Sequence, residues 1–182
     1  MIPKHSFLLL FMSFCLFAYS QDQNKSVSLS VTASPFPTKS SENKDIGVIG
    51  KLSLEFHTSN KLSFQGSFFT SNNVFFKNDN NHQINSYGFI PSVQYYFLDH
   101  PKFNVFGQLG YGFGFEDQTL YGGKVENSAL TIFSIGGGLN YKLKNKLDLQ
   151  LNLPYFKAKN KTINKESASG LGVFIGLNFI IK

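Results

Sequence analysis

The sequence predicts an all-β domain folded as an eight-stranded, antiparallel, up-and-down barrel, and three observations carry this prediction. Apolar and polar residues alternate with period two over eight segments, whereas no segment has a convincing helical period of 3.6. The spacers between these segments are alternately long and short. The number of segments is even, which places both ends of the chain at the same end of a barrel.

Residues 1–20 precede the first strand and are predicted to be a cleaved signal peptide. Lys4 is followed by an apolar run over residues 7–17 and by Ala18-Tyr19-Ser20, which has small residues at its first and third positions. The run is too short to span a bilayer as a helix. Its removal also removes Cys15, the only cysteine, so neither a disulfide nor a cysteine metal site is expected.

The barrel domain is assigned to residues 21–182, and its strands follow in order along the chain. In the first four, apolar residues alternate mainly with Ser, Thr, Gly and Gln; these strands are 27–33, 46–57, 62–68 and 87–97. In the last four, Leu, Ile, Phe and Tyr alternate mainly with Gly, Ser, Asn and Gln; these strands are 103–115, 133–143, 147–153 and 171–181.

The spacers set the direction of the strands. Short spacers occur at 59–60, 99–101 and 144–146, and long polar spacers at 34–45, 72–83, 116–128 and 154–169. Strict alternation puts every tight turn at one end and every long loop at the other, which is typical of outer-membrane barrels.

The composition of the two faces indicates which one meets lipid. The apolar face carries no charge, and the other face holds mostly Gly, Ser, Gln and Asn, where a soluble barrel would display Lys and Glu to water. Aromatic residues near strand ends, among them Tyr95, Tyr96 and Phe97, fit interfacial girdles. We therefore predict a transmembrane barrel with a filled polar lumen. A soluble secreted barrel that binds an apolar ligand is the alternative.

Nine polar residues are predicted to project into the lumen together, and eight strands leave an interior that side chains fill. A hydrogen-bonded plug is therefore expected in preference to an ion path. The residues are Lys51, Glu55, Gln65, Gln94, Gln108, Asn140, Asp148, Gln150 and Asn152.

No catalytic, cofactor-binding or metal-binding residues are predicted. The Gly-rich runs at 107–114 and 136–138 lack the helix that a phosphate-binding loop requires. His57-Thr58-Ser59 resembles the His and Ser pattern of outer-membrane lipid A deacylases, with Glu55 on the same face, but it lies at a tight turn. A lipid-modifying enzyme is kept as an alternative function.

Charge points to one candidate contact surface. All 17 basic residues are Lys, and the formal net charge is +6. Without Arg, the chain has no planar guanidinium group that could bind phosphate with two parallel hydrogen bonds, so nucleic-acid binding is not expected. The segment with Lys157, Lys159, Lys161 and Lys165 is the only basic cluster, and it is a candidate for contacts with lipopolysaccharide or anionic glycans.

Two runs carry a resemblance to a known family. The run 89–97, a tight turn and the Gly and aromatic run 106–114 resemble the small eight-stranded outer-membrane β-barrel family, the OmpA-like and OmpX-like group in its Bacteroidetes-type form. The resemblance implies a monomer in the outer membrane of a Gram-negative cell envelope, in contact with outer-membrane lipids, with a structural or surface-interaction role and no catalysis. Its extracellular partner is not identified. The chain departs from the group in running on from Phe179 to Lys182.

Overall fold

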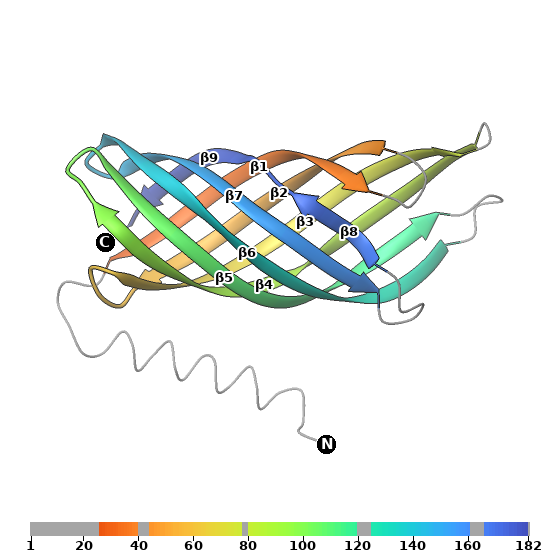
Figure 1. Ribbon diagram of the computed structural model, residues 1–182, viewed down its shortest axis with the longest axis horizontal. Helices are drawn as coiled ribbons and strands as arrows, with labels where there is room; N and C mark the ends of the chain where they lie inside the picture. The colour runs from red at the N-terminus through yellow and green to blue at the C-terminus, as the bar shows by residue number, and fades with distance from the viewer. Residues whose placement is uncertain (1–25, 40–43, 78–79, 120–124, 161–165, 182) are drawn as a thin grey trace, which may run out of the picture.

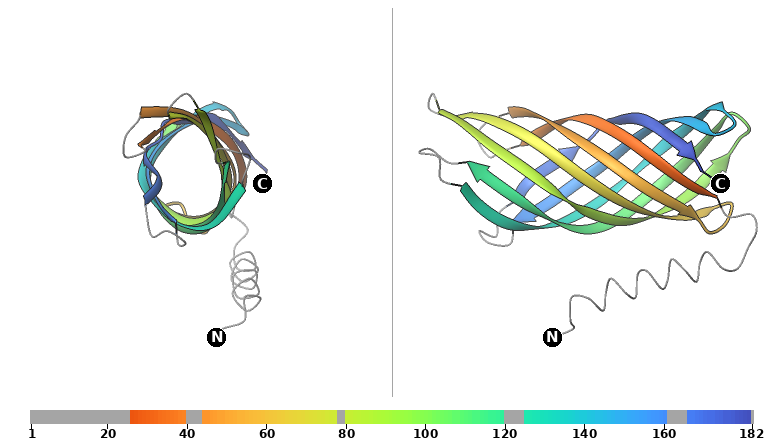
Figure 2. Two further views of the ribbon diagram at one scale, coloured as in Figure 1. Left: turned by 90° about the vertical axis from the view of Figure 1, so that its right-hand side faces the viewer. Right: turned by 180° about the vertical axis from the view of Figure 1, so that it is seen from behind.

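The computed structural model describes residues 26–39, 44–77, 80–119, 125–160 and 166–181. Neighbouring strands pair in the order β6-β5-β4-β3-β2-β1-β9-β7-β8, and the additional pairing of β6 with β7 closes the sheet into a barrel (Figures 1 and 2). The described residues include no helix that is long and apolar enough to cross a membrane. The strands are β1 Val27–Lys39, β2 Lys44–His57, β3 Leu62–Lys77, β4 Asn80–Asp99, β5 Phe103–Thr119, β6 Val125–Lys144, β7 Leu147–Asn160, β8 Glu166–Leu171 and β9 Phe174–Ile180.

The described residues at both ends of the barrel domain lie at one end of the barrel, which we call the turn end. The tight connections 58–61, 100–102 and 145–146 also lie there, and the opposite end is called the loop end. The N–H of Ile181 donates to the carbonyl of Val27 over 2.8 Å, so the last strand closes on the first. The predicted closed, antiparallel, up-and-down barrel of eight strands is confirmed, with β8 and β9 forming two parts of the eighth.

The strands are longer than the sequence predicted, and the assignment of the long spacers to loops is wrong in large part. β1 continues to Lys39, β3 to Lys77 and β7 to Asn160. At the loop end, the polar residues of these spacers continue the antiparallel ladders, as in the β3–β4 register up to Lys77↔Asn80. Main-chain hydrogen bonding does not require apolar alternation, so strands that leave the hydrocarbon layer no longer show period two.

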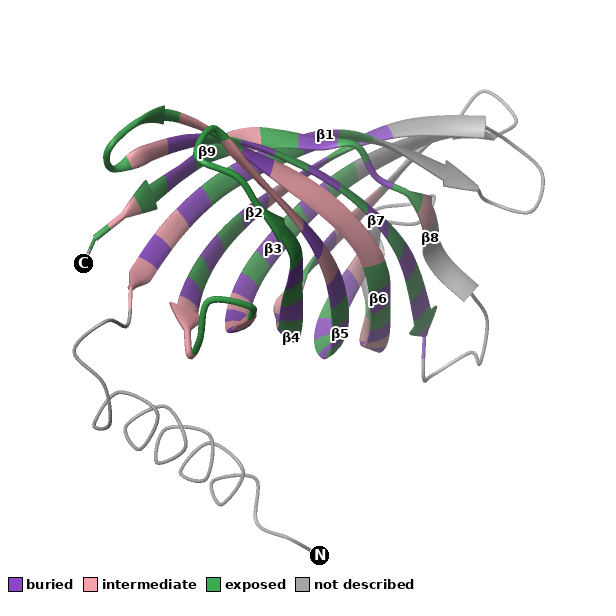
Figure 3. Ribbon diagram, turned by 60° about the vertical axis from the view of Figure 1, so that its left-hand side comes forward, coloured by how far each residue is buried: buried purple, intermediate pink, exposed green. Residues whose placement is uncertain are grey.

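Side chains alternate between an apolar exterior and a largely buried interior, as the bands along each strand show (Figure 3). Phe68 is 63% exposed, whereas its neighbour Ser67 is 1% exposed. The period of two is therefore the period of the barrel wall, with apolar residues outward and polar or small residues inward.

The eighth strand is divided at Gly172 and Val173, between β8 and β9. Pro154 of the neighbouring β7 accepts a hydrogen bond from the N–H of Gly172 over 2.9 Å but has no N–H to return. On the other side, the N–H of Val173 donates to Oγ of Ser34 over 2.9 Å instead of to a main-chain carbonyl. Residues 172–173 therefore depart from regular ladder pairing on both sides.

Candidate functional site in the barrel lumen

The nine polar residues singled out in the sequence all lie inside the barrel. Their exposed fractions range from 0% for Gln94 to 6% for Gln108, with Lys51 at 5%. They do not form one network, because the structure brings some together with residues that the sequence did not single out and separates others.

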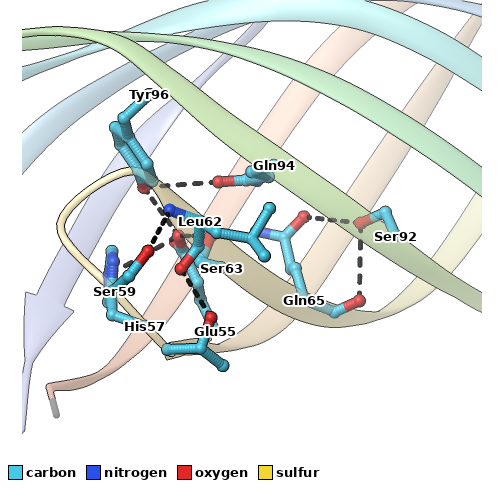
Figure 4. Close-up of polar contacts among 10 residues, drawn as sticks. Glu55, His57, Ser59, Leu62, Ser63, Gln65, Ser92, Gln94 and Tyr96 are labelled. Atoms are coloured by element: carbon cyan, nitrogen blue, oxygen red, sulfur yellow. Dashed lines mark hydrogen bonds and ion pairs between the residues drawn. The ribbon is translucent and has the colours of Figure 1, made fainter.

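Glu55 lies at the centre of the first group, the carboxylate cluster, near the turn end (Figure 4). Its Oε1 accepts hydrogen bonds from the hydroxyl of Ser63 over 2.5 Å and from the hydroxyl of Tyr96 over 2.6 Å. Nε2 of His57 lies 3.5 Å from the same oxygen. Glu55 is 2% exposed, so its carboxyl group depends on these neighbours and not on bulk water for hydrogen bonds.

Ser63 belonged to the face predicted to line the lumen but was not among the nine residues singled out, whereas Tyr96 was wrongly assigned to an aromatic girdle. Tyr96 is 4% exposed, whereas Tyr95 is 44% exposed and belongs to the exterior. Because adjacent residues of a strand point to opposite faces, the pair Tyr95-Tyr96 required one aromatic ring inside the barrel.

A second group, the amide relay, crosses the lumen from β7 to β3. Asn152 donates to Oε1 of Gln108 over 2.9 Å, and Nε2 of Gln108 donates to Oγ of Ser92 over 3.1 Å and to Oε1 of Gln65 over 3.3 Å. These bonds tie β7, β5, β4 and β3 together through the interior, as members of a lumen plug would.

The remaining side of the polar lumen has fewer bonds within the protein. In the described strands, ten buried polar side-chain atoms have no partner in the protein, and most belong to β1, β6, β7 and β9. Buried polar groups of this kind usually pair with water. The atoms are Oγ of Ser28, Ser30 and Ser86, Oγ1 of Thr32, Nε2 of Gln94 and Gln150, and Oδ1 of Asn140, Asp148, Asn152 and Asn178.

Lys51 lies where the polar part of the lumen meets buried aromatic side chains. Its Nζ lies 5.2 Å from the centroid of the Phe174 ring, a cation–π contact, and Phe174 is completely buried. The Phe174 ring also packs against Phe156, with 5.6 Å between the ring centroids.

Toward the loop end one part of the lumen is apolar, which the sequence analysis did not predict, although Glu116 and Asn160 are also buried there, with Nδ2 of Asn160 donating to Oε1 of Glu116 over 3.3 Å. A cavity encloses about 380 Å³ of space free of protein atoms, part of it open to solvent. We call it the apolar chamber. Its lining is almost entirely hydrocarbon, with Ser71 and Ser86 as the two polar residues; the other lining residues are Ile49, Phe69, Ile90, Leu130, Ile132, Phe156 and Ala158.

The His57 and Ser59 pattern does not assemble as a nucleophile and base. Oγ of Ser59 accepts hydrogen bonds from the N–H groups of Leu62 over 3.0 Å and Lys61 over 3.3 Å, which is a turn-stabilising role. Ser63, the serine close to Glu55, donates directly to the carboxylate. In an Asp/Glu-His-Ser triad the histidine stands between the acid and the serine, and here both meet the same oxygen of Glu55.

The basic cluster is placed differently from the expectation. Lys157 and Lys159 lie on β7 with their side chains exposed on the outer surface, and are not in a loop. Lys161 and Lys165 lie outside the described residues. Thus the part of the cluster that the structure describes consists of two outward residues of β7 near the loop end, where β7 is paired with β6 and, through Lys157↔Ser169 and Lys159↔Glu166, with β8.

Solved structures share this architecture across almost their whole length. Neisserial surface protein A (NspA) has a TM-score of 0.67 and is 16% identical, over 86% of this chain and 99% of that one. Ail, the attachment invasion locus protein of Yersinia pestis, has a TM-score of 0.54 at 17% identity over 86% and 96% of the two chains. The N-terminal β-barrel domain of Pseudomonas aeruginosa OprF has a TM-score of 0.53 at 12% identity, over 88% and 100%.

These identities show a shared fold. A search of curated protein sequences found no match. The sequence model of the outer membrane protein beta-barrel domain matches residues 6–179, which is nearly the whole chain. The apolar exterior and this match exclude the alternative of a soluble secreted barrel. The chain belongs to the outer membrane protein beta-barrel domain family and is an outer-membrane barrel protein.

Proposed function

We propose that the protein is a monomeric surface-interaction barrel without catalysis, which contacts anionic glycans or lipopolysaccharide through the basic cluster of Lys157, Lys159, Lys161 and Lys165. The observation that carries the proposal is the outward exposure of Lys157 and Lys159 on β7, beyond the lipid-facing Tyr155. Residues two apart on a strand share one face at a spacing of about 7 Å. Two ammonium groups on this outer face form a local positive field close to the membrane surface.

A similar barrel supports the chemical class of ligand. Ail, at 15% identity and a TM-score of 0.55, has been solved in complex with the heparin analogue sucrose octasulfate. A polysulfated sugar and the phosphates of lipopolysaccharide share a dense negative charge that lysines attract. For this chain, the basic cluster is the surface where such an anion would be held.

The test removes the four charges and compares the variant with a matched control. Lys157→Gln, Lys159→Gln, Lys161→Gln and Lys165→Gln are combined, and binding to immobilised heparin and to purified lipopolysaccharide is measured by surface plasmon resonance. We expect a loss of binding that wild type shows and that added salt weakens. Equal retention by wild type and by this variant would refute the proposal.

The matched control removes four lysines from the turn end. Lys102→Gln, Lys142→Gln, Lys144→Gln and Lys146→Gln change the net charge by the same amount, so binding should persist if the position of the charge matters. An equal loss in both variants would mean that net charge alone attracts the polyanion, and the assignment to the basic cluster would fail.

The absence of catalysis is tested separately. Ser59→Ala and Ser63→Ala are expressed in the native host, and lipid A is examined by mass spectrometry. We expect spectra identical to those of wild type and of a strain that lacks the gene, because Ser59 supports a turn and Ser63 is bonded to a carboxylate. A lipid A species present in wild type and missing in either variant would establish an enzyme.

A further inference from the structure

The turn end of the barrel carries a ring of lysines. Each of its three tight turns contributes at least one, and all four residues are exposed. They are Lys61 from the turn between β2 and β3, Lys102 from the turn between β4 and β5, and Lys144 and Lys146 on either side of residue 145 in the turn between β6 and β7. We call these four residues the basic rim.

The acidic residues described at the turn end do not offset this charge. Glu55 and Asp148 are 2% and 3% exposed and lie inside the barrel. Asp99 is exposed, but Nζ of Lys142 lies 3.5 Å from its Oδ1 and also donates to the carbonyl of His100 over 3.3 Å. The exposed carboxylate of this end is therefore already paired with a lysine that does not belong to the basic rim.

One lysine of the basic rim shares a face with residues that meet lipid. Lys144 is the register partner of Leu147, and partners across an antiparallel ladder lie on one face of the sheet. Leu147 is also the partner of Phe179, which is exposed on the outside of the barrel. Lys144 therefore lies on the outside of the wall and does not face the lumen.

The basic rim and the apolar wall follow each other directly along the chain. Leu143, which precedes Lys144, is 49% exposed. Lys102 precedes Phe103, whose register partner Tyr141 is 43% exposed. Neighbouring residues of a strand are only about 3.4 Å apart, so the lysines begin at the edge of the hydrocarbon layer. Their methylene groups can lie on the apolar wall while the ammonium groups reach the lipid headgroups.

Two of the turns form one continuous part of the basic rim. The N–H of Lys142 donates to the carbonyl of Lys102 over 2.8 Å, so the turn with Lys102 lies against the strand that leads to Lys144 and Lys146. Three ammonium groups thus belong to adjacent segments. A phosphate group at this place has several lysines within reach, whereas a single surface lysine would attract it only weakly.

We propose that the basic rim binds the phosphate groups of anionic phospholipids in the inner leaflet of the outer membrane, whose acyl chains lie against the adjoining apolar wall. Barrels of this kind have their short turns on the periplasmic side, where the leaflet consists of phospholipid. Lysines next to a membrane segment are attracted to anionic headgroups. Peptidoglycan also carries negative charge on that side, but it has no acyl chains to contact Tyr141 and Leu143. The basic rim lies at the opposite end from the basic cluster and does not depend on the proposed function.

The chain has no tryptophan, so single introduced indoles can report which lipid lies beside them. Tyr141→Trp places an indole on the wall next to the basic rim, and Phe68→Trp places one on the outward face of β3, beside Phe89 and away from the turn end. Each variant is reconstituted in mixtures of phosphatidylcholine and phosphatidylglycerol, with one or the other brominated on its acyl chains to quench indole fluorescence on contact. We expect phosphatidylglycerol to be enriched about fivefold or more beside Tyr141→Trp, and close to its bulk fraction beside Phe68→Trp.

Removal of the lysines then tests the cause of the enrichment. The rim variant combines Lys61→Gln, Lys102→Gln, Lys144→Gln and Lys146→Gln. It should lower the enrichment beside Tyr141→Trp to the value found beside Phe68→Trp. The matched control replaces the four lysines of the basic cluster by Gln, which changes the net charge equally, and it should leave the enrichment beside Tyr141→Trp intact. Equal enrichment at both indoles, or enrichment that survives in the rim variant, refutes the proposal.

A measurement without tryptophan keeps the proposal falsifiable if an indole variant does not fold. Wild type and the rim variant without an indole are extracted from membranes in mild detergent and examined by native mass spectrometry. We expect wild type to retain phosphatidylglycerol or cardiolipin and the rim variant to lose it. Co-sedimentation with purified peptidoglycan distinguishes the other polyanion. Equal lipid retention by the two proteins, with peptidoglycan binding that only wild type shows, would assign the basic rim to peptidoglycan and overturn the proposal.

Discussion

The hydroxyl of Tyr96 offers the sharpest test of the carboxylate cluster, since Tyr96→Phe removes one oxygen and keeps the ring. That hydroxyl donates to the buried carboxylate of Glu55 over 2.6 Å. A hydrogen bond to a charged group contributes about 1.5–3 kcal/mol, so Tyr96→Phe should lower the free energy of unfolding by that amount. Tyr95→Phe is the matched control on the lipid face, and we expect a change within about 0.5 kcal/mol.

The assay is urea unfolding of the barrel in phospholipid vesicles, followed by circular dichroism and by the gel mobility of unheated samples. A double-mutant cycle with Glu55→Gln assigns the cause. With a neutral acceptor the hydrogen bond is worth only about 0.5–1.5 kcal/mol, so Tyr96→Phe should cost less in that background. Equal losses for the two tyrosine variants, or the same loss with Glu55 and Gln, would refute the reasoning and leave ring packing as the source of stability.

Three further predictions concern closure, packing and conduction. Gly176→Ala should prevent closure of the barrel, because a Cβ at that position would overlap the carbonyl of Val31 across the β1–β9 ladder. The control Gly50→Ala should fold normally, because its Cβ would meet only Thr70, at 3.9 Å. The gel mobility of unheated samples distinguishes a closed barrel from an unclosed one. Ile132→Ala in the apolar chamber should lower the free energy of unfolding by about 2–5 kcal/mol in the same urea assay. A loss below about 1 kcal/mol would show that the neighbouring side chains move in and fill the space that the substitution leaves. Planar-bilayer recordings of wild type should show no steady conductance, because the amide relay crosses the lumen; regular open events would contradict a plug.

Most of the barrel could be predicted because residues in the membrane-spanning wall alternate between an outward side facing lipid and an inward side facing the lumen. In Leu147–Leu153, each apolar residue faces lipid and each polar residue faces the lumen. Exposure keeps alternating to the end of β7, but beyond Tyr155 the inward residues Phe156 and Ala158 are apolar. The turn end could also be predicted, because only two residues, 145–146, connect the end of β6 at Lys144 with the start of β7 at Leu147, and so short a connection requires adjacent antiparallel strands. At the loop end the rule is lost, since water can surround both faces, and the strand ends could not be located.

The apolar chamber was not predicted, because each strand face was described by its prevailing residue types, and the few apolar residues on the inward face were overlooked. Pairs of adjacent apolar residues break the alternation and place one member inside. In Phe68-Phe69 the two exposures are 63% and 8%, and in Tyr155-Phe156 they are 45% and 5%. The same pattern in Val173-Phe174 gives 40% and 0%. Phe69 and Phe156 line the apolar chamber and Phe174 packs against Phe156, so a search for such doublets would have found these inward apolar residues, together with Tyr96 near the turn end.

Proline positions carry a second kind of information that hydropathy does not contain. On an antiparallel strand the parity of a residue decides which face its side chain occupies and also toward which neighbour its N–H points. Pro35 lacks a donor toward the last strand from β1, and Pro154 lacks one toward the same strand from β7, so Gly172 and Val173 are approached by prolines from both sides. Inside the hydrocarbon layer a missing main-chain bond is costly. The irregular pairing of residues 172–173 therefore follows from the positions of Pro35 and Pro154, which a hydropathy pattern does not reveal.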